Sequence, residues 1–233
     1  MVAVRIIALE TTERIGTVAA LEGDNLLIDL RLCQNQRSAE SLAPGMLKLI
    51  QKVDWRPTDV DLVAVTIGPG SFTGLRVGLT TAKTFAYCVQ AEILGVDTLE
   101  AIAAGVPDDV KALSVAVDAQ RGEVVAGSLR RNKDGWFAFS EAPRLVDVDT
   151  WLSDLSPNTV VAGPILRKIS NRIPDDVRML EPRYWSASAA AVGRLAARQY
   201  AAGKRHSVCE LVPRYSRRSA AEEKWEKKHR TCE

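Results

Sequence analysis

Two acidic residues stand at matching points of the sequence, where paired carboxylates could support phosphoryl transfer. Glu10 ends an apolar segment and is followed by polar residues and Gly16, and Asp118 ends a second such segment and is followed by Gly122 after three residues. If both segments are equivalent strands, the two carboxylates face each other across a cleft between two halves. Acidic residues are also common where a turn begins, so the pair alone does not establish a catalytic site.

A second chemically suggestive feature is one unusual string of residues. It reads Gly68-Pro69-Gly70-Ser71-Phe72-Thr73-Gly74-Leu75-Arg76. The string follows a buried segment and opens a helix, where backbone N–H groups can bind an anion. It is not a Walker A loop, because that loop needs Lys and then Ser or Thr after its last glycine. We favour a rigid strand-to-helix turn, in which Pro69 fixes φ, Gly70 permits unusual dihedrals and Ser71 or Thr73 caps the helix.

The helix that follows, roughly 74–89, carries a row of very small side chains. The row consists of Gly74, Gly78, Ala82 and Ala86 at spacings of four. Such a row lets another element approach closely. Glycine inside a helix costs about 0.5–1 kcal/mol relative to alanine, so Gly78 should have a packing reason. Packing against the protein's own sheet and packing against another subunit both fit. We expect a subunit interface here, together with Met46, Leu49 and Ile50 of the preceding helix.

Hydrophobic patterns place these features in a doubled α/β arrangement. The first set comprises strands at 4–9, 16–21 and 26–32, a helix through 42–53, a strand at 62–67, the helix at 74–89 and a strand at 93–96. Looser equivalents follow at 113–118, 122–129, 136–139 and 159–162, with a helix at 186–201. We therefore expect βββαβα twice: a first half (1–105), a smaller second half (106–212) and a basic C-terminal segment (213–233).

Charge and residue inventory narrow the function classes. The 233 residues carry 31 Lys and Arg against 29 Asp and Glu, which argues against a strongly basic nucleic-acid binder. The basic segment has a net charge of +3, and Arg214, Arg217 and Arg218 in it are modest candidates for contact with a partner or a nucleic acid. The only histidines are His206 and His229, which disfavours a histidine-based metal site or a Ser-His-Asp triad in the body of the chain.

Cysteine spacing and hydropathy predict where the protein resides. No two of the four cysteines form a Cys-x-x-Cys pair. The apolar N-terminus is interrupted by Arg5 and fails as a signal peptide, and no apolar stretch approaches the length of a membrane span. We expect a cytoplasmic protein with reduced thiols and no membrane partner.

Four segments together resemble the TsaB (YeaZ) family. They are Arg5-Ile-Ile-Ala-Leu-Glu-Thr-Thr12, the string at 68–76, Asp118-Ala-Gln-Arg-Gly-Glu-Val124 and Pro213-Arg-Tyr215. They occur in the family's order over nearly the whole chain, up to about residue 218, and the string at 68–76 is the specific one. The resemblance implies an α/β fold of two RNase H-like halves of the actin/Hsp70/sugar-kinase (ASKHA) superfamily, in agreement with the doubled pattern.

The resemblance also implies an accessory function without a catalytic site of its own. TsaB proteins serve the threonylcarbamoylation of adenosine 37 in tRNAs that read ANN codons. They bind and activate the paralogous transferase TsaD, together with the ATPase TsaE, while TsaC makes the threonylcarbamoyl-adenylate. The implied partners are therefore a TsaD-like transferase, a TsaE-like ATPase and, through the complex, tRNA. Family members also form homodimers through the first-half helices, where the row of small side chains lies. ATP or ADP would then be expected at the complex rather than on this chain.

The alternative is an active ASKHA-type ATPase or small-molecule kinase that uses Glu10 and Asp118. Thr11, Thr12 and Arg121 are then candidates for weak nucleotide contact, although Glu13 adds negative charge where phosphate would lie. A metallopeptidase is disfavoured, because the segment 38–44 lacks the His-x-x-x-His pair of TsaD-type relatives and no other metal ligands are evident. The sequence does not distinguish a homodimer from a heterodimer in solution, and it does not locate the second-half helices well.

Overall fold

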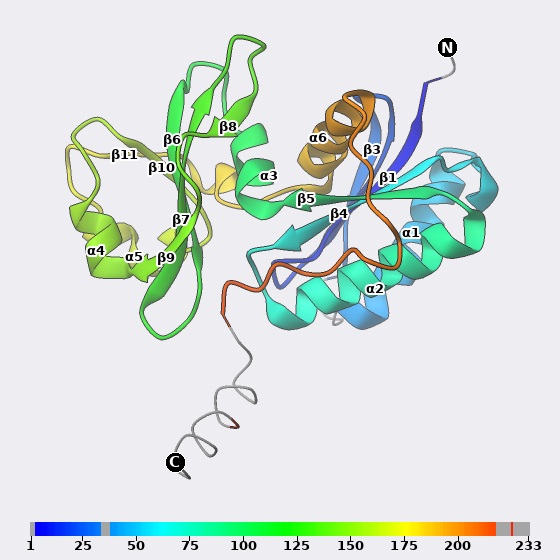
Figure 1. Cartoon of the computed structure of the whole chain (residues 1–233), viewed down its shortest axis with the longest axis horizontal. Helices are drawn as coiled ribbons and strands as arrows, with labels where there is room; N and C mark the ends of the chain where they lie inside the picture. Colours follow the sequence, from blue (N-terminus) through cyan, green and yellow to red (C-terminus); the bar gives the residue numbers. More distant parts are fainter. Residues whose placement is uncertain (1–2, 34–37, 218–224, 226–233) are drawn as a thin grey trace.

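The computed structural model describes residues 3–33, 38–217 and 225 (Figure 1). Residues 218–224 and 226–233, which include Arg218 and most of the basic C-terminal segment, lie outside the described residues. The described chain forms two β-sheets that stand side by side, with helices packed on them (Figure 1). Within the described residues, no helix combines the length and the apolar character needed to cross a membrane.

The first sheet has the strand order β3-β2-β1-β4-β5. Its strands are β1 (Arg5–Glu10), β2 (Thr17–Glu22), β3 (Asn25–Arg31), β4 (Leu62–Gly68) and β5 (Glu92–Asp97). The pairs β1–β2 and β2–β3 are antiparallel, whereas β1–β4 and β4–β5 are parallel. β4 is buried along its whole length, as expected for a central parallel strand covered on both faces.

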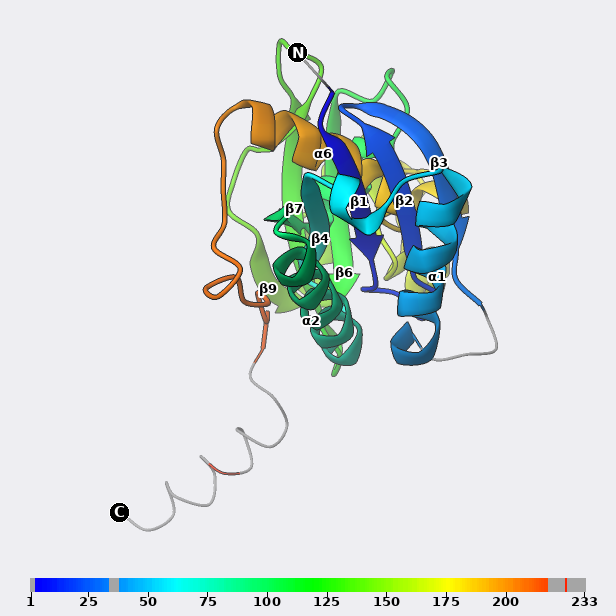
Figure 2. The ribbon, with the colours of Figure 1, turned by 90° about the vertical axis from the view of Figure 1, so that its right-hand side faces the viewer.

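Helices cover both faces of the first sheet. α1 (Ser38–Lys52) and α2 (Phe72–Val89) pack on one face, and α6 (Ala189–Ala201) packs on the other (Figure 2). Alternation along β1 supplies both cores: Ile7 and Leu9 join the core under α1 and α2, while Ile6 and Ala8 join the core under α6. A short 3-10 turn (Pro57–Asp59) connects α1 to β4.

The second sheet repeats the order of the first, with β7 paired to β6 as β2 is to β1. Its order is β11-β10-β6-β7-β8, and β9 also pairs with β7. The strands are β6 (Ala112–Asp118), β7 (Glu123–Arg131), β8 (Phe137–Phe139), β9 (Arg144–Asp147), β10 (Val160–Ala162) and β11 (Arg178–Met179). The helices are α3 (Thr98–Ala104) between the sheets, α4 (Val148–Ser153) and α5 (Leu166–Ile169), with 3-10 turns at Ser170–Arg172 and Pro182–Tyr184. The repeated order confirms the expected fold class of two RNase H-like halves.

Helix α6 departs from the expected division of the chain. The sequence places it in the second half (106–212), but in the structure it packs mainly on β1 and β2 of the first sheet. A Cβ added at Gly193 would overlap Leu21 of β2, and the N–H of Ala189 donates to the Thr17 hydroxyl at 2.9 Å. The first sheet is thus completed by a helix that is distant in the sequence.

The row of small side chains on α2 serves the protein's own core. Gly74, Gly78, Ala82 and Ala86 are all buried in the single chain. The prediction of a partner interface at these residues is corrected, because a Cβ at Gly78 would overlap the Thr11 side chain just beyond β1. The other three residues of the predicted interface, Met46, Leu49 and Ile50 of α1, are also buried in this core.

After α6, the chain returns along the first half as a strap, defined here as residues 205–217. Figure 1 shows it running beside β5 and across α2 to the gap between the sheets. His206 forms a β-bridge to Ile93, and the N–H of Gly95 donates to its Nδ1 at 3.0 Å. Lys83 of α2 donates to the carbonyls of Cys209 and Leu211. The strap thereby delivers its last residues to the cleft.

Candidate functional site

Three hydroxyl side chains meet where the parallel strands of the first sheet end. Thr12 follows β1, Ser71 follows β4 and Thr98 follows β5. The register places Gly68 opposite Asp97, which brings the turn after β4 beside the start of α3. Ligands of open α/β sheets bind at the carboxyl ends of such strands.

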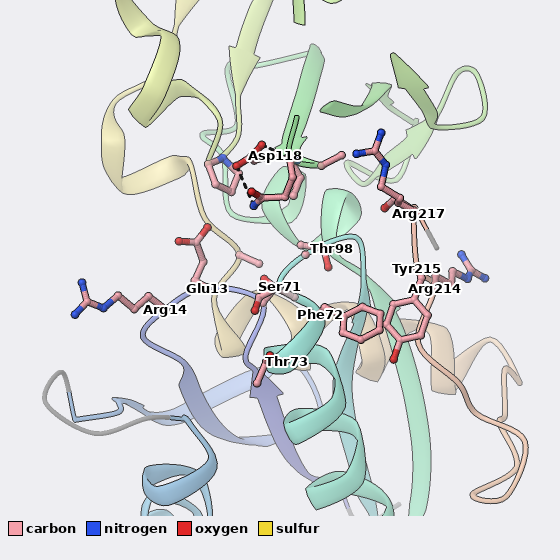
Figure 3. Close-up of a pocket in the computed structure, with 18 of the residues that line it drawn as sticks. Glu13, Arg14, Ser71, Phe72, Thr73, Thr98, Asp118, Arg214, Tyr215 and Arg217 are labelled. Carbon is pink, nitrogen blue, oxygen red and sulfur yellow. Dashed lines mark hydrogen bonds between the residues drawn. The ribbon is translucent and has the colours of Figure 1, made fainter. Parts of the chain in front are cut away.

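The second half contributes the opposite wall of a cleft (Figure 3). Asp118 ends β6, Arg121 lies in the turn that follows, and Pro164, Arg167 and Lys168 come after β10. The turn is tight, since Gln120 and Arg121 have φ of +67° and +56°. The two walls enclose a cavity of about 1080 Å³.

The lining of this cavity is strongly basic, although the whole chain is nearly neutral. Of its 22 residues, six are cationic and two are acidic. The cations are Arg14, Arg121, Arg167, Lys168, Arg214 and Arg217, and the acids are Glu13 and Asp118. The cavity therefore carries a net excess of positive charge and favours an anionic ligand.

Both acidic residues of the lining are held by cations. Lys168 Nζ lies 2.5 Å from Oδ2 of Asp118, and Oδ1 of the same carboxylate accepts the N–H of Gln120 at 2.9 Å. Arg167 contacts Glu13 at 3.1 Å. These ion pairs join strand ends and helices of the cleft, and they neutralise the carboxylates without removing the positive excess.

Glu10 does not face Asp118 across the cleft, which corrects the prediction from the sequence. Its side chain is 1% exposed and is absent from the cavity lining. Its carboxylate turns back to accept the N–H of Thr12 at 2.6 Å and the Thr12 hydroxyl. Burial raises the pKa of Glu10 from 4.5 to about 7, against the hydrogen bonds from Thr12, which lower it, and Glu13 raises it further.

The predicted nucleotide contacts are accordingly divided between the cavity and the core. Thr12, Asp118 and Arg121 line the cavity, whereas Glu10 and Thr11 lie outside the lining and are buried. Among the described residues, no three His, Cys, Asp or Glu side chains are clustered as metal ligands.

The string at 68–76 forms the expected strand-to-helix turn. Ser71 is the N-cap of α2, and its hydroxyl accepts the N–H of Gly74 at 3.2 Å. The N–H of Ser71 donates to the Thr12 carbonyl at 3.1 Å. A Cβ at Gly70 would lie 2.5 Å from the Thr12 Cβ, and one at Gly74 would overlap the Thr11 carbonyl. The glycines of the string thus permit close contact with the segment after β1.

The string and the strap contact each other at the mouth of the cavity. The rings of Phe72 and Tyr215 are 4.4 Å apart, and the Arg76 guanidinium lies 3.9 Å from the centre of the Phe72 ring. Arg76 Nε donates to the Tyr215 hydroxyl at 3.0 Å. The N–H of Arg214 donates to the Ile67 carbonyl at 2.7 Å. Two sequence motifs far apart in the chain therefore build one wall.

The two arginines singled out in the described part of the strap lie at this wall (Figure 3). Arg214 is 3.8 Å from the Asp97 carboxylate, and Arg217 pairs with Glu123 at the start of β7. Sequence reasoning missed Arg14, Arg167 and Lys168 as cavity residues. No local signal marks them, since Arg14 lies in the bend after β1 whereas Arg167 and Lys168 lie on α5, more than 150 positions later.

Comparisons with known proteins confirm the resemblance to the TsaB (YeaZ) family. Residues 33–139 match the family profile of TsaD, the tRNA N6-adenosine threonylcarbamoyltransferase. The chain is 28% identical over 228 residues to the tRNA threonylcarbamoyladenosine biosynthesis protein TsaB of Bacillus subtilis, covering 94% of this chain and 97% of that protein. It is 26% identical to TsaB of Escherichia coli over 96% of this chain and 97% of that protein.

Solved structures show the same fold. YeaZ from Pseudomonas aeruginosa superposes with a TM-score of 0.79 at 20% identity, covering 91% of this chain and 99% of that chain. A second structure, described as similar to peptidase YeaZ from the same organism, gives a TM-score of 0.80 at 21% identity, over 92% of this chain and 100% of that one. The fold assignment thus rests on both the repeated strand order and these neighbours.

Proposed function

Because the chain resembles TsaB (YeaZ) proteins along nearly its whole length, we propose that it acts in the biosynthesis of threonylcarbamoyladenosine in tRNA. The observation that carries this proposal is the match to two TsaB proteins that covers at least 94% of this chain and 97% of each relative. The match of residues 33–139 to the transferase family profile supports the same pathway.

Within that pathway, the chain is an accessory subunit that is not an enzyme by itself. It binds and activates a TsaD-like transferase, is joined by a TsaE-like ATPase and reaches adenosine 37 of tRNAs reading ANN codons through the complex. Alone, it forms a homodimer in the cytoplasm, and ATP or ADP binds at the complex. The position of Glu10 supports the accessory role, because its carboxylate is buried against Thr12 and lies outside the cavity.

The alternative function, an ATPase or small-molecule kinase, is favoured by one observation: Thr12 and Asp118 line the same cavity. The pairing of Asp118 with Lys168 weighs against it, since the carboxylate already has a cation of the chain as its partner. Steady ATP turnover by the isolated chain would favour the kinase if the Asp118→Asn variant lost it.

Reconstitution tests the proposed function. The chain is purified together with TsaD-, TsaE- and TsaC-like proteins of its own host, and threonylcarbamoyladenosine in a transcribed ANN-reading tRNA is measured by mass spectrometry. Product should form only when this chain is present, and the chain alone should form none. Equal product in a reaction that omits the chain would remove the accessory role.

The partner surface must lie on the outer faces of α1 and α2 if these helices form it, because their inner faces are core. Leu47 of α1 is 55% exposed and Tyr87 of α2 is 71% exposed. Leu47→Glu with Tyr87→Glu should abolish co-purification with the TsaD-like protein while the melting temperature is unchanged. Exposed Leu145→Glu in the second half is the matched control.

A further inference from the structure

The two halves contact each other in different ways on the two sides of the cavity. On the side of α3, the apolar core under α6 continues into the second sheet, where Val115, Val125 and Leu129 belong to it. On the open side, the walls are separated by the cavity of about 1080 Å³. Apolar packing therefore joins the halves near α3, whereas polar contacts set their separation across the cavity.

One polar contact that crosses the cavity joins Glu13 to Arg167. Glu13 lies in the bend after β1 of the first half, and Arg167 belongs to α5 of the second. Arg167 Nη1 lies 3.1 Å from Oε2 of Glu13. Arg167 Nη2 also donates to the Ser186 hydroxyl at 2.6 Å, and this bond holds the guanidinium in place for the ion pair.

The strap provides a second crossing contact. It belongs to the first half as far as Arg214, because the N–H of Arg214 donates to Ile67 and a Cβ at Gly68 would lie 2.5 Å from the Arg214 carbonyl oxygen. Three residues later, Arg217 pairs with Glu123, the first residue of β7 in the second half. The strap thus carries a cation from the first half to a carboxylate of the second.

The two ion pairs lie on opposite sides of the cavity and are partly exposed. Figure 3 shows Glu13 on one side and Arg217 on the other. The four side chains of the two pairs are between 24% and 46% exposed. Ion pairs of this exposure are weak and are screened by salt, so they can open without unfolding of the protein.

We propose that these two ion pairs form a clasp that holds the cavity at one width. With the clasp closed, the halves are joined both near α3 and on the two sides of the cavity. With the clasp open, the second half pivots about the apolar contact near α3, and the cavity widens. Residues 215–217 of the strap are the arm of this clasp, since none of their side chains is fully buried. The clasp is a property of the isolated chain and does not depend on the proposed accessory function.

Distances between spin labels on the two halves test the clasp. The labels are attached at Glu40→Cys in α1 and Thr150→Cys in α4, two exposed positions, after the four native cysteines are replaced by serine. The labelled full chain is diluted with unlabelled chain, so that double electron–electron resonance reads distances within one chain. The chain with an intact clasp should give one narrow distribution of distances.

Removal of one carboxylate from each ion pair should open the clasp. Glu13→Gln with Glu123→Gln should shift the distribution to longer distances and broaden it. Asp109→Asn with Asp154→Asn is the matched control, because it removes two carboxylates that pair with arginines within the second half, and it should leave the distribution unchanged. Sodium chloride at about 1 M should act on the intact clasp as the first double substitution does, since the screening length falls to about 3 Å.

Charge reversal distinguishes ion pairing from a general loss of packing. Glu123→Arg alone should lengthen the distance, because it places two cations together. Glu123→Arg combined with Arg217→Glu should restore the original distribution, because the pair is rebuilt with its charges exchanged. An unchanged distribution in Glu13→Gln with Glu123→Gln, or no restoration in the chain with exchanged charges, would overturn the proposal.

Discussion

Glu10→Gln is expected to remove the loss of stability that ionisation of Glu10 causes as the pH rises from about 5 to about 8. The wild-type carboxyl is buried, and burial raises its pKa from 4.5 to about 7 in the folded state. The folded state therefore holds the proton more tightly than the unfolded chain does. The stabilising contribution of the protonated form is complete below pH 4.5 and is lost as the pH rises through about 7.

The size of this effect follows from the two pKa values. A shift from 4.5 to about 7, at 1.36 kcal/mol per unit, corresponds to about 3 kcal/mol of unfolding free energy lost between pH 4.5 and pH 8. Glutamine preserves the shape and the acceptor for Thr12, but its amide group is buried without titrating. The absolute stability of the variant depends on how that amide is accommodated, whereas its pH dependence does not.

The assay is urea denaturation at a series of pH values from 5 to 8, with wild type and Glu10→Gln compared at each. The difference between the two curves should change by about 2–3 kcal/mol across this range, in favour of the variant at high pH. Glu141→Gln, which removes an exposed carboxylate, controls for the loss of one charge. Parallel curves for wild type and Glu10→Gln would refute the assignment of a buried, protonated Glu10.

Three further outcomes are expected. Gly78→Ala should destabilise the single chain by about 1–3 kcal/mol in thermal denaturation, because the new Cβ overlaps Thr11; an unchanged melting temperature would contradict the close packing. Acidification should release the strap, because the pKa of His206 is lowered, first by burial. The stability that neutral His206 contributes is therefore present above pH 6.5 and is lost as the pH falls further. Faster deuterium exchange at the Gly95 N–H at low pH would report this release. The isolated chain should release phosphate from ATP no faster than its Asp118→Asn variant does.

The strands and main helices could be predicted from the sequence because their signals are local. β1, β4 and α2 lie within two residues of their predicted bounds, since continuous apolar runs and helical periodicity depend only on neighbouring residues. The partner of α6 could not be predicted in the same way. Its alanine-rich face indicates a close contact without showing which sheet it meets, and only the tertiary fold brings it to β1 and β2.

The candidate site could be predicted in part, and the wrong or missing predictions have a common cause. The sequence correctly indicated that the ends of β1 and β6 meet at one cleft, but it gave no means to tell an exposed carboxylate from one folded back onto the chain. Glu10 could be misplaced because the decisive partner, Thr12, is only two residues away and offers both an N–H and a hydroxyl. The basic lining could not be predicted, because its cations come from segments scattered across the chain.

The small residues of the string at 68–76 and of α2 acquire one explanation from the structure. Gly70, Gly74 and Gly78 all approach the segment Thr11–Thr12, where a Cβ at each would be too close. The Thr11 hydroxyl also donates to the Gly74 carbonyl at 2.8 Å. This contact holds the first turns of α2 against the end of β1, so the N-terminus of the helix is fixed at the cavity. The small residues of this motif thus serve packing within one chain.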